Sequence, residues 1–386
     1  MQSGNQTSDL QYDVAVVGGG VVGAAAAWKL AKAGAKVALL EKGDLCSGAS
    51  STNPGFCVLS YRENSLTMRF ALEQQRSWDA LQAEIGDVEY VPSGGLIPLT
   101  DHAQEEILSG LCRHAKKLGL DEIGLITAAK AKELEPALDE SQIVGGCWCP
   151  GEGRVNPFKM NLNMAAKARE LGADIFTHTP VTNLRIENGL VRALETPRGE
   201  IKADLFILAN GAWARELASL AGHDIPILFE RGEAMVSMQV APRVKRMITD
   251  GALFNQSPTD HPMVIGACLG QTVSGNIVIA QATTRPDDFD KSNSFDGPRL
   301  IAKRVLKLFP SLKDIEIIRM WAGLVSYTDD HQPVFGAFAN PSNLFVANTF
   351  HSAVAISPAI GGMIADYWKT GSLPEEAKPY TPERFA

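Results

Sequence analysis

Three glycines near the start of the chain, Gly18, Gly20 and Gly23, stand at the spacing G-x-G-x-x-G. They follow an apolar run at residues 14–17, which reads as a buried strand, and they lead into an alanine-rich helix predicted over residues 21–33. Glycines placed between a strand and a helix in this way are typical of a site that binds a dinucleotide. A lone glycine pattern would be a weak signal, so the surrounding elements matter.

Each glycine has a physical task in such a turn. Gly18 permits the tight turn, Gly20 lets the backbone approach a pyrophosphate because it has no Cβ, and Gly23 allows close packing of helix on strand. The free N–H groups at the helix N-terminus attract phosphate, and Val22 in this first turn is expected to face the cofactor.

A second apolar run, residues 36–40, ends in Glu41, roughly 20 residues beyond the glycines. The carboxylate of Glu41 can accept hydrogen bonds from a ribose diol, and Lys42 is expected to lie beside the same ligand. The complete β-α-β unit predicts a site for an ADP moiety. It does not distinguish FAD from NAD.

The segment that follows, residues 43–64, is rich in Gly, Ser, Thr and Asn and is predicted to be a loop. It begins at the end of a parallel strand where ligands bind in such folds, so we expect it to touch the cofactor; a solvated surface loop is the alternative. Ser50, Ser51, Thr52 and Asn53 of this loop could donate hydrogen bonds to phosphates or to a ring edge.

Two later segments repeat the order of strand, small-residue turn and helix. A strand at residues 201–210 runs into Gly211 and Trp213, and a strand at residues 344–347 is followed by His351 and Ser352. A helix is predicted from about residue 357, with a proline in its first turn. Both turns are candidates for contact with the same dinucleotide.

Residues 226–320 differ in character, because short apolar segments alternate with turns there. This pattern predicts an antiparallel sheet, with one helix at residues 300–309. Its notable cations are Arg231, Arg285 and Arg319, each more often structural than ligand-binding when taken singly.

The sequence therefore predicts an α/β protein with two domains. A Rossmann-like domain would comprise residues 1–90, 145–225 and 322–386. A second, α+β substrate domain on a mostly antiparallel sheet would comprise residues 91–144 and 226–321.

The bulk composition excludes several classes of function. The 386 residues are 45% hydrophobic and 21% charged, with a formal net charge of −8, so nucleic acid and anionic membranes are poor partners. No apolar run is long enough to span a membrane, and the polar first ten residues contain no apolar signal segment, so a flexible tail and a cytoplasmic location are expected. The six scattered cysteines are expected to be reduced, and no metal site is predicted.

Taken together, these motifs resemble the D-amino acid oxidase superfamily of FAD-dependent enzymes. The motifs are the opening glycine unit, GASSTNPG, VEYVPSGGL, EGRVNP, LANGAW, TDDHQPVFG and FHSAVAISPAIG, which together cover nearly the whole chain. Within that group the chain looks most like the beta, catalytic subunits of heteromeric opine, sarcosine and hydroxyproline-type dehydrogenases.

The resemblance implies FAD as the cofactor, bound without a covalent link, since the cysteine that carries flavin in some relatives would fall near Gly323. It implies that the cofactor is also approached by Ala49, Ser50, Ser51, Asn53, Gly55, Val181, Gly211, Trp213 and Gly323. It further implies that residues from His351 and Ser352 through Ala353, Val354 and Ala355 face the flavin ring. N–H groups at a helix N-terminus would stabilise the negative charge that forms on the flavin when it is reduced.

The implied reaction is oxidation of a C–N bond next to a carboxylate, with hydride transfer to flavin N5 and hydrolysis of the resulting imine. Tyr327 and Arg231 are the expected partners of the substrate carboxylate, with Arg62 and Arg319 in reserve. His351 and Ser352 complete the expected catalytic set. The substrate would be a small amino or imino acid.

Two other functions remain open from the sequence. One is a dehydrogenase of the same fold that acts on a hydroxy acid or glycerol phosphate, although no cluster of cations suggests a phosphate substrate. The other is a non-catalytic FAD-binding subunit. The resemblance also allows an iron–sulfur or flavin partner subunit as electron acceptor.

Overall fold

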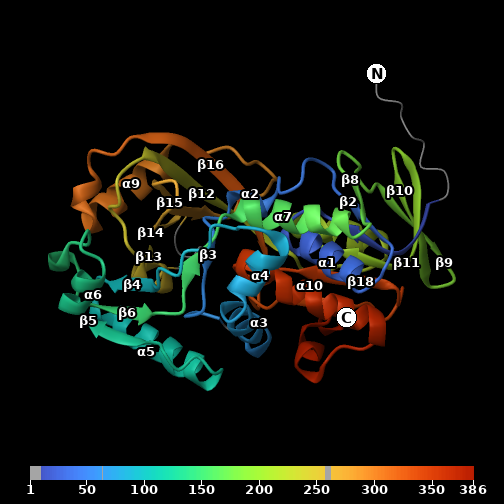
Figure 1. Ribbon diagram of the computed structural model, residues 1–386, viewed down its shortest axis with the longest axis horizontal. Helices are drawn as coiled ribbons and strands as arrows, with labels where there is room; N and C mark the ends of the chain where they lie inside the picture. Colours follow the sequence, from blue (N-terminus) through green and yellow to red (C-terminus); the bar gives the residue numbers. More distant parts are fainter. Residues whose placement is uncertain (1–9, 63, 257–261) are drawn as a thin grey trace.

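Two large sheets organise the molecule, and they lie side by side along its longest axis (Figure 1). The computed structural model describes residues 10–62, 64–256 and 262–386. The predicted N-terminal tail falls almost entirely outside these described residues. The described part contains no helix that is both long and apolar enough to cross a lipid bilayer.

The first sheet is a parallel sheet with an antiparallel edge strand, in the order β17-β18-β11-β1-β2-β8. A hairpin of β9 and β10 pairs with β11. The strands are β1 (Leu10–Val17), β2 (Val37–Leu40), β8 (Asp174–Phe176), β9 (Asn183–Glu187), β10 (Leu190–Thr196), β11 (Gly199–Leu208), β17 (Val334–Ala337) and β18 (Leu344–Asn348).

Strand β1 is apolar on both faces because both are covered. Val14 and Val16 pack into the core beneath α1 (Val21–Lys32), whereas Ala15 and Val17 pack on the opposite side, next to α8 (Ala214–Leu220). Helix α1 lies between α7 (Pro157–Glu170) and α10 (Ala353–Thr370). A central parallel strand buried in this way brings the start of α1 to the carboxyl edge of the sheet.

The second sheet is mostly antiparallel, in the order β16-β12-β15-β14-β13-β4-β6-β5. The amphipathic helix α9 (Asp296–Leu308) packs on it through Ile301, Val305 and Leu308. The strands are β4 (Gly95–Leu99), β5 (Gly124–Thr127), β6 (Gly145–Cys149), β12 (Leu228–Gln239), β13 (Met247–Ile248), β14 (Val264–Gln271), β15 (Asn276–Thr284) and β16 (Ile317–Tyr327).

Short elements connect the two sheets. A two-stranded ribbon joins β3 (Phe56–Cys57) to β7 (Gly153–Arg154). The remaining helices are α2 (Ala49–Thr52), α3 (Ser65–Gln75), α4 (Trp78–Ile85), α5 (His102–Lys117) and α6 (Ala128–Leu134). The chain ends in two 3₁₀ turns, Glu375–Tyr380 and Pro382–Phe385.

The strand pairings bear on the expected domain boundaries. Strand β6 and all of β16 pair within the second sheet, although residues 145–149 and 322–327 were assigned to the Rossmann-like domain. We therefore propose that the division lies after Cys149 and after Tyr327. Both segments would then belong to the domain built on the second sheet.

One local prediction is corrected by the structure. The late helix begins at Ala353 rather than at residue 357, so Pro358 lies inside it; the Val354 carbonyl accepts a hydrogen bond from the Ser357 hydroxyl at 3.2 Å.

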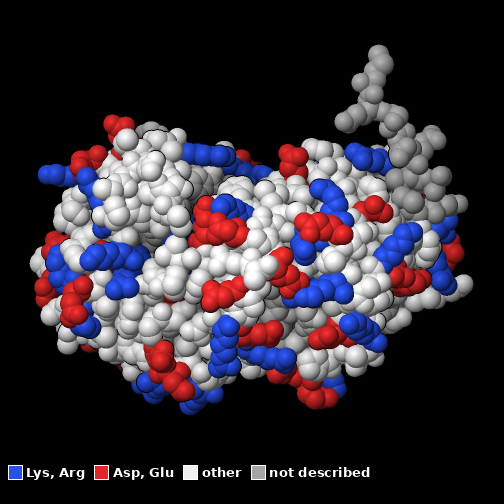
Figure 2. Space-filling model, in the orientation of Figure 1, with Lys and Arg blue, Asp and Glu red and all other residues white. Residues whose placement is uncertain are grey.

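Surface charge is mixed. On the face shown in Figure 2, acidic and basic side chains alternate without a large patch of one sign. This agrees with the absence of a basic block in the sequence.

Candidate cofactor and substrate site

A cavity of about 340 Å³ lies at the carboxyl edge of the first sheet, and we call it the glycine-loop cavity. Gly18 and Gly20 line it, as do Glu41 and the turn at Gly211. A Cβ at Gly23 would come within 1.8 Å of the Gly18 carbonyl oxygen, so Gly23 supports the turn from behind. The predicted tasks of the glycines therefore differ: two of them border the cavity and the third permits the packing of α1.

The carboxylate of Glu41 is held by the backbone at the rim of this cavity. It accepts a hydrogen bond from the N–H of Gly19 at 2.7 Å and one from the N–H of Gly43 at 2.8 Å. These contacts fix the side chain where it borders the cavity. The oxygens retain lone pairs that a ribose hydroxyl could donate to.

Lys42 and Trp213 form one wall of the same cavity. The Lys42 ammonium lies 3.3 Å from the centroid of the Trp213 ring, a cation–π contact, and burial lowers the pKa of Lys42. Val22 and Val181 also line this cavity.

A second cavity, of about 460 Å³, lies between the N-terminus of α10 and strands β12, β15 and β16; we call it the central cavity. The two cavities adjoin and share eight lining residues. The shared residues are Val21, Ala49, Ser50, Val325, Ser326, Thr349, Phe350 and Ala353.

Arg62 is the buried cation of the central cavity. Only 2% of its surface is exposed, and its guanidinium donates to three carbonyls: Val58 at 2.9 Å, His351 at 2.5 Å and Ser352 at 3.5 Å. No carboxylate of the described residues lies within ion-pair distance of it. Burial lowers the pKa of Arg62 to about 10, so the group is still charged at neutral pH.

His351 is kept neutral by its surroundings. Burial, followed by the charge of Arg62, lowers the pKa of His351 to about 4. The residue is nevertheless exposed to solvent, and it borders the central cavity. It lies beside Tyr61, with ring centroids 5.7 Å apart.

Tyr327 borders the central cavity beside a charged pair. The Arg285 guanidinium lies 5.0 Å from the centroid of the Tyr327 ring, and Arg285 also pairs with Glu230 at 3.1 Å. Tyr327 stacks on His331, with centroids 5.9 Å apart. Burial raises the pKa of Tyr327, so its hydroxyl is protonated at neutral pH.

Most of the other predicted contacts line one cavity or both. Ser352, Ala353, Val354, Asn53 and Gly323 border the central cavity. A Cβ at Gly323 would meet the Thr52 hydroxyl at 1.9 Å, so glycine is needed there for the approach of α2.

Several predicted residues are not among those that line the two cavities. Arg231 pairs with Asp290 at 3.3 Å instead, and Arg319 lies exposed on the edge strand β16. The structure therefore does not bring these two arginines to the substrate side. Ser51, Gly55 and Ala355 lie behind the cavity walls; Gly55, for example, packs against the Val155 carbonyl.

Sequence reasoning missed Glu152, Tyr61 and Phe254. Glu152 is 1% exposed, and one of its oxygens accepts hydrogen bonds from the N–H groups of Leu59 at 2.7 Å and Ser60 at 2.6 Å. It thus holds the segment that leads to Arg62. The EGRVNP motif contained the only available signal for Glu152, and nothing in that motif indicated this contact.

The described residues fit an extended dinucleotide. The two cavities adjoin, and the Asn210 side-chain oxygen is buried without a hydrogen-bond partner where it borders the glycine-loop cavity. Residues at the N-termini of α1 and α10 line these cavities, and the first N–H groups of a helix have no partner within the helix, although that of Val21 donates to the Ser50 hydroxyl at 3.0 Å.

Comparison with known proteins agrees with this geometry. The family of FAD dependent oxidoreductases matches residues 13–367, so the chain belongs to that family and uses FAD. It is 29% identical to a glycine oxidase of Geobacillus kaustophilus over 366 residues, which is 92% of each chain. It is 26% identical to the mitochondrial dimethylglycine dehydrogenase of Mus musculus, over 97% of this chain but 44% of that protein.

Solved structures give the same picture. An L-proline dehydrogenase from P. horikoshii superimposes with a TM-score of 0.88 at 26% identity, covering 98% of each chain. The glycine oxidase from Geobacillus kaustophilus gives a TM-score of 0.87 at 25% identity, covering 97% of this chain and 98% of that one. The predicted family, fold class and cofactor are confirmed.

Proposed function

We propose that this protein oxidises the C–N bond of an amino or imino acid, using FAD as the hydride acceptor. The observation that carries the proposal is the adjacency of the two cavities: a dinucleotide bound at the glycine turn would point toward the central cavity, which is bordered by strands of the second sheet. Relatives named for glycine, dimethylglycine and proline support the substrate class.

When bound, FAD supplies the hydride acceptor, and the protein side chains position the substrate. Apolar and aromatic groups at the far end of the central cavity, among them Tyr61, Leu253 and Phe254, exclude water from the C–N bond. The Tyr327 hydroxyl, protonated at neutral pH, is our candidate donor to the substrate carboxylate. Arg285 lies beside it, through the ring contact described above.

No side-chain base is assigned. His351 is neutral at pH 7 and borders the cavity. Its unprotonated ring nitrogen can therefore accept a hydrogen bond from a substrate amine without adding charge. An amine that binds in its neutral form needs no further base.

Three finer expectations stay proposals. The flavin is non-covalent, which would be seen as its release when the protein is denatured in acid. Electrons pass to an iron–sulfur or flavin partner subunit rather than to oxygen, which slow reoxidation in air would indicate. The substrate range extends to opines and secondary amines.

The test is an anaerobic titration of the purified, FAD-loaded protein. Candidate secondary amines, opines, D-amino acids and L-amino acids are added singly, with a hydroxy acid and glycerol phosphate as controls. We expect an amine to bleach the flavin absorbance and the two controls to leave it unchanged. Bleaching by a control alone would contradict the proposed substrate class, and tight flavin that no compound reduces would favour a non-catalytic subunit.

A further inference from the structure

The turn before α10 is held in an unusual backbone conformation. Thr349 and Ser352 both have positive φ angles, +57° and +49°, in the left-handed region that residues other than glycine rarely adopt. Such a conformation is energetically costly, and it persists only when its surroundings hold it in place. Something must therefore fix this turn.

Arg62 provides that restraint from a distant part of the chain. It donates to the carbonyls of His351 and Ser352, the two residues directly before α10. Arg62 is itself held by its bond to Val58 and by the contacts of Glu152 with the preceding loop. The result is a rigid tie between residues 58–62 and the start of α10.

Positive charge is concentrated at this point of the fold. The N-terminus of α10 carries a partial positive charge, and its N-cap Ser352 makes no side-chain capping bond. Arg62 adds a full positive charge at the same place; the buried acid Glu152 interacts with it electrostatically, but no carboxylate of the described residues lies within ion-pair distance of it. The Arg62 guanidinium and the N-terminus of α10 therefore both border the central cavity, which a ligand can fill.

We propose that Arg62 is a positioning residue that sets the reduction potential of the flavin: it orients the first turn of α10 and adds its charge where the reduced flavin becomes anionic. This inference rests on the proposed function, in which the ring end of FAD occupies the central cavity. The competing occupant is the carboxylate of the substrate, and the two occupants give different results below.

The experiment measures the midpoint potential of protein-bound FAD, in excess FAD, in the wild type and in R62M, R62Q and R62K. Removing the charge in R62M or R62Q should shift the equilibrium between oxidised and reduced flavin at least tenfold toward the oxidised form. This corresponds to a fall in the midpoint potential of about 30 mV for a two-electron couple. R62K keeps the charge and should recover most of the wild-type potential. R76M, at an exposed arginine of the neighbouring segment, is the matched control and should leave the potential unchanged.

Weak retention of FAD does not prevent the test. By thermodynamic linkage, the same shift appears as a greater loss of affinity for reduced FAD than for oxidised FAD, and both dissociation constants can be measured in each variant. Equal losses for the two forms would overturn the proposal, because they would indicate a purely structural role.

An unchanged potential with weakened binding of a carboxylate substrate would also overturn it, and would assign Arg62 to the substrate. These failures are distinct from failure of the proposed function. That failure would appear as wild-type protein that binds no flavin, or that binds flavin which no amine reduces.

Discussion

Asn348 donates from its side-chain amide to the carbonyl of Gly211 across 2.9 Å, and so joins two turns 137 residues apart. Its side-chain oxygen accepts hydrogen bonds from the Ser326 hydroxyl at 3.0 Å and the Thr349 N–H at 2.7 Å. Asn348 is 4% exposed and borders the glycine-loop cavity. One side chain thus fixes three segments around the space where FAD fits.

We therefore expect N348D to weaken FAD binding. The substitution keeps the acceptor oxygen but replaces the donor to Gly211 with a second carboxylate oxygen, beside a ligand that carries phosphates. Losing a buried hydrogen bond and adding this repulsion should cost about 1–3 kcal/mol, or roughly 5- to 150-fold in affinity. Equilibrium dialysis of FAD against the apoprotein measures the dissociation constant, and N183D, at an exposed asparagine, is the matched control. Wild-type affinity in N348D would contradict this account of the residue.

Glu41 should matter for retention of the cofactor and not for its reduction. In E41A the N–H groups of Gly19 and Gly43 lose their acceptor, and the ribose loses its proposed partner. We expect the dissociation constant for FAD to rise roughly 10- to 100-fold, the value of a charged hydrogen bond. At saturating FAD, the rate of flavin reduction by substrate should stay near wild type. A fall in the rate of flavin reduction with unchanged affinity for FAD would contradict the proposed role of Glu41 in retaining the cofactor.

His351 gives a prediction for acidic pH. Its folded pKa of about 4 lies below the ordinary value of 6.5, so between these values the unfolded chain binds a proton that the folded protein does not. Stability should therefore fall as the pH is lowered from about 6.5 to about 4, and this part of the loss should disappear in H351Q. Thermal unfolding of both proteins across that range measures it. Parallel stability profiles for the wild type and H351Q would show that His351 does not contribute.

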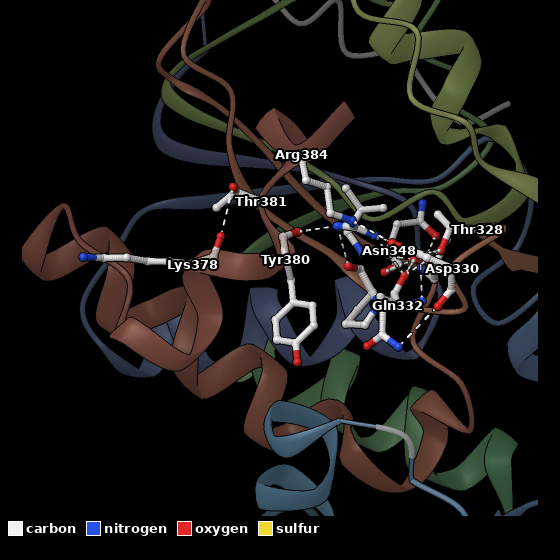
Figure 3. Close-up of polar contacts among 11 residues, drawn as sticks. Thr328, Asp330, Gln332, Asn348, Lys378, Tyr380, Thr381 and Arg384 are labelled. Atoms are coloured by element: carbon white, nitrogen blue, oxygen red, sulfur yellow. Dashed lines mark hydrogen bonds and ion pairs between the residues drawn. The ribbon is translucent and has the colours of Figure 1, made fainter. Parts of the chain in front are cut away.

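Arg384 ties the end of the chain to the loop that follows β16. Figure 3 shows its guanidinium reaching the segment that contains Asp330 and Gln332. It donates to Asp330 at 3.1 Å and to the carbonyls of Pro333 and Tyr380, each at 2.9 Å. The same loop places His331 and Pro333 on the wall of the central cavity.

R384A should lower the free energy of unfolding by about 1–3 kcal/mol, because buried carbonyls lose a charged donor. K378A removes an exposed ion pair with Glu375 from the same C-terminal segment and should cost less than about 1 kcal/mol. Urea unfolding of the two variants compares these values. Equal effects would mean that Arg384 contributes no more than a surface ion pair.

The ADP end of the site could be predicted because its determinants are local. The glycines, α1 and Glu41 lie within one β-α-β unit, and spacing alone relates them. The turn at Gly211 was predicted for the same reason.

The contacts on the substrate side of the site could not be predicted from residue spacing. Arg62 meets His351 across 289 residues, and Glu152 reaches Leu59 across 93, so no sequence period relates these partners. Arg231 was favoured as the carboxylate partner on residue type alone. The strand register turns its side chain to Asp290, whereas its neighbour Glu230 borders the cavity. The late helix was misplaced because Pro358 looked like a first-turn proline, although its missing N–H is tolerated within α10.

The central claim is that an amine reduces the FAD held in these two adjoining cavities. The most direct measurement is the flavin absorbance of the anaerobic protein during titration with an amino or imino acid. The account predicts stoichiometric bleaching by at least one amine, with one keto or aldehyde product formed for each flavin reduced. A fully loaded flavoprotein whose absorbance no amine changes, and which a hydroxy acid bleaches instead, would contradict it.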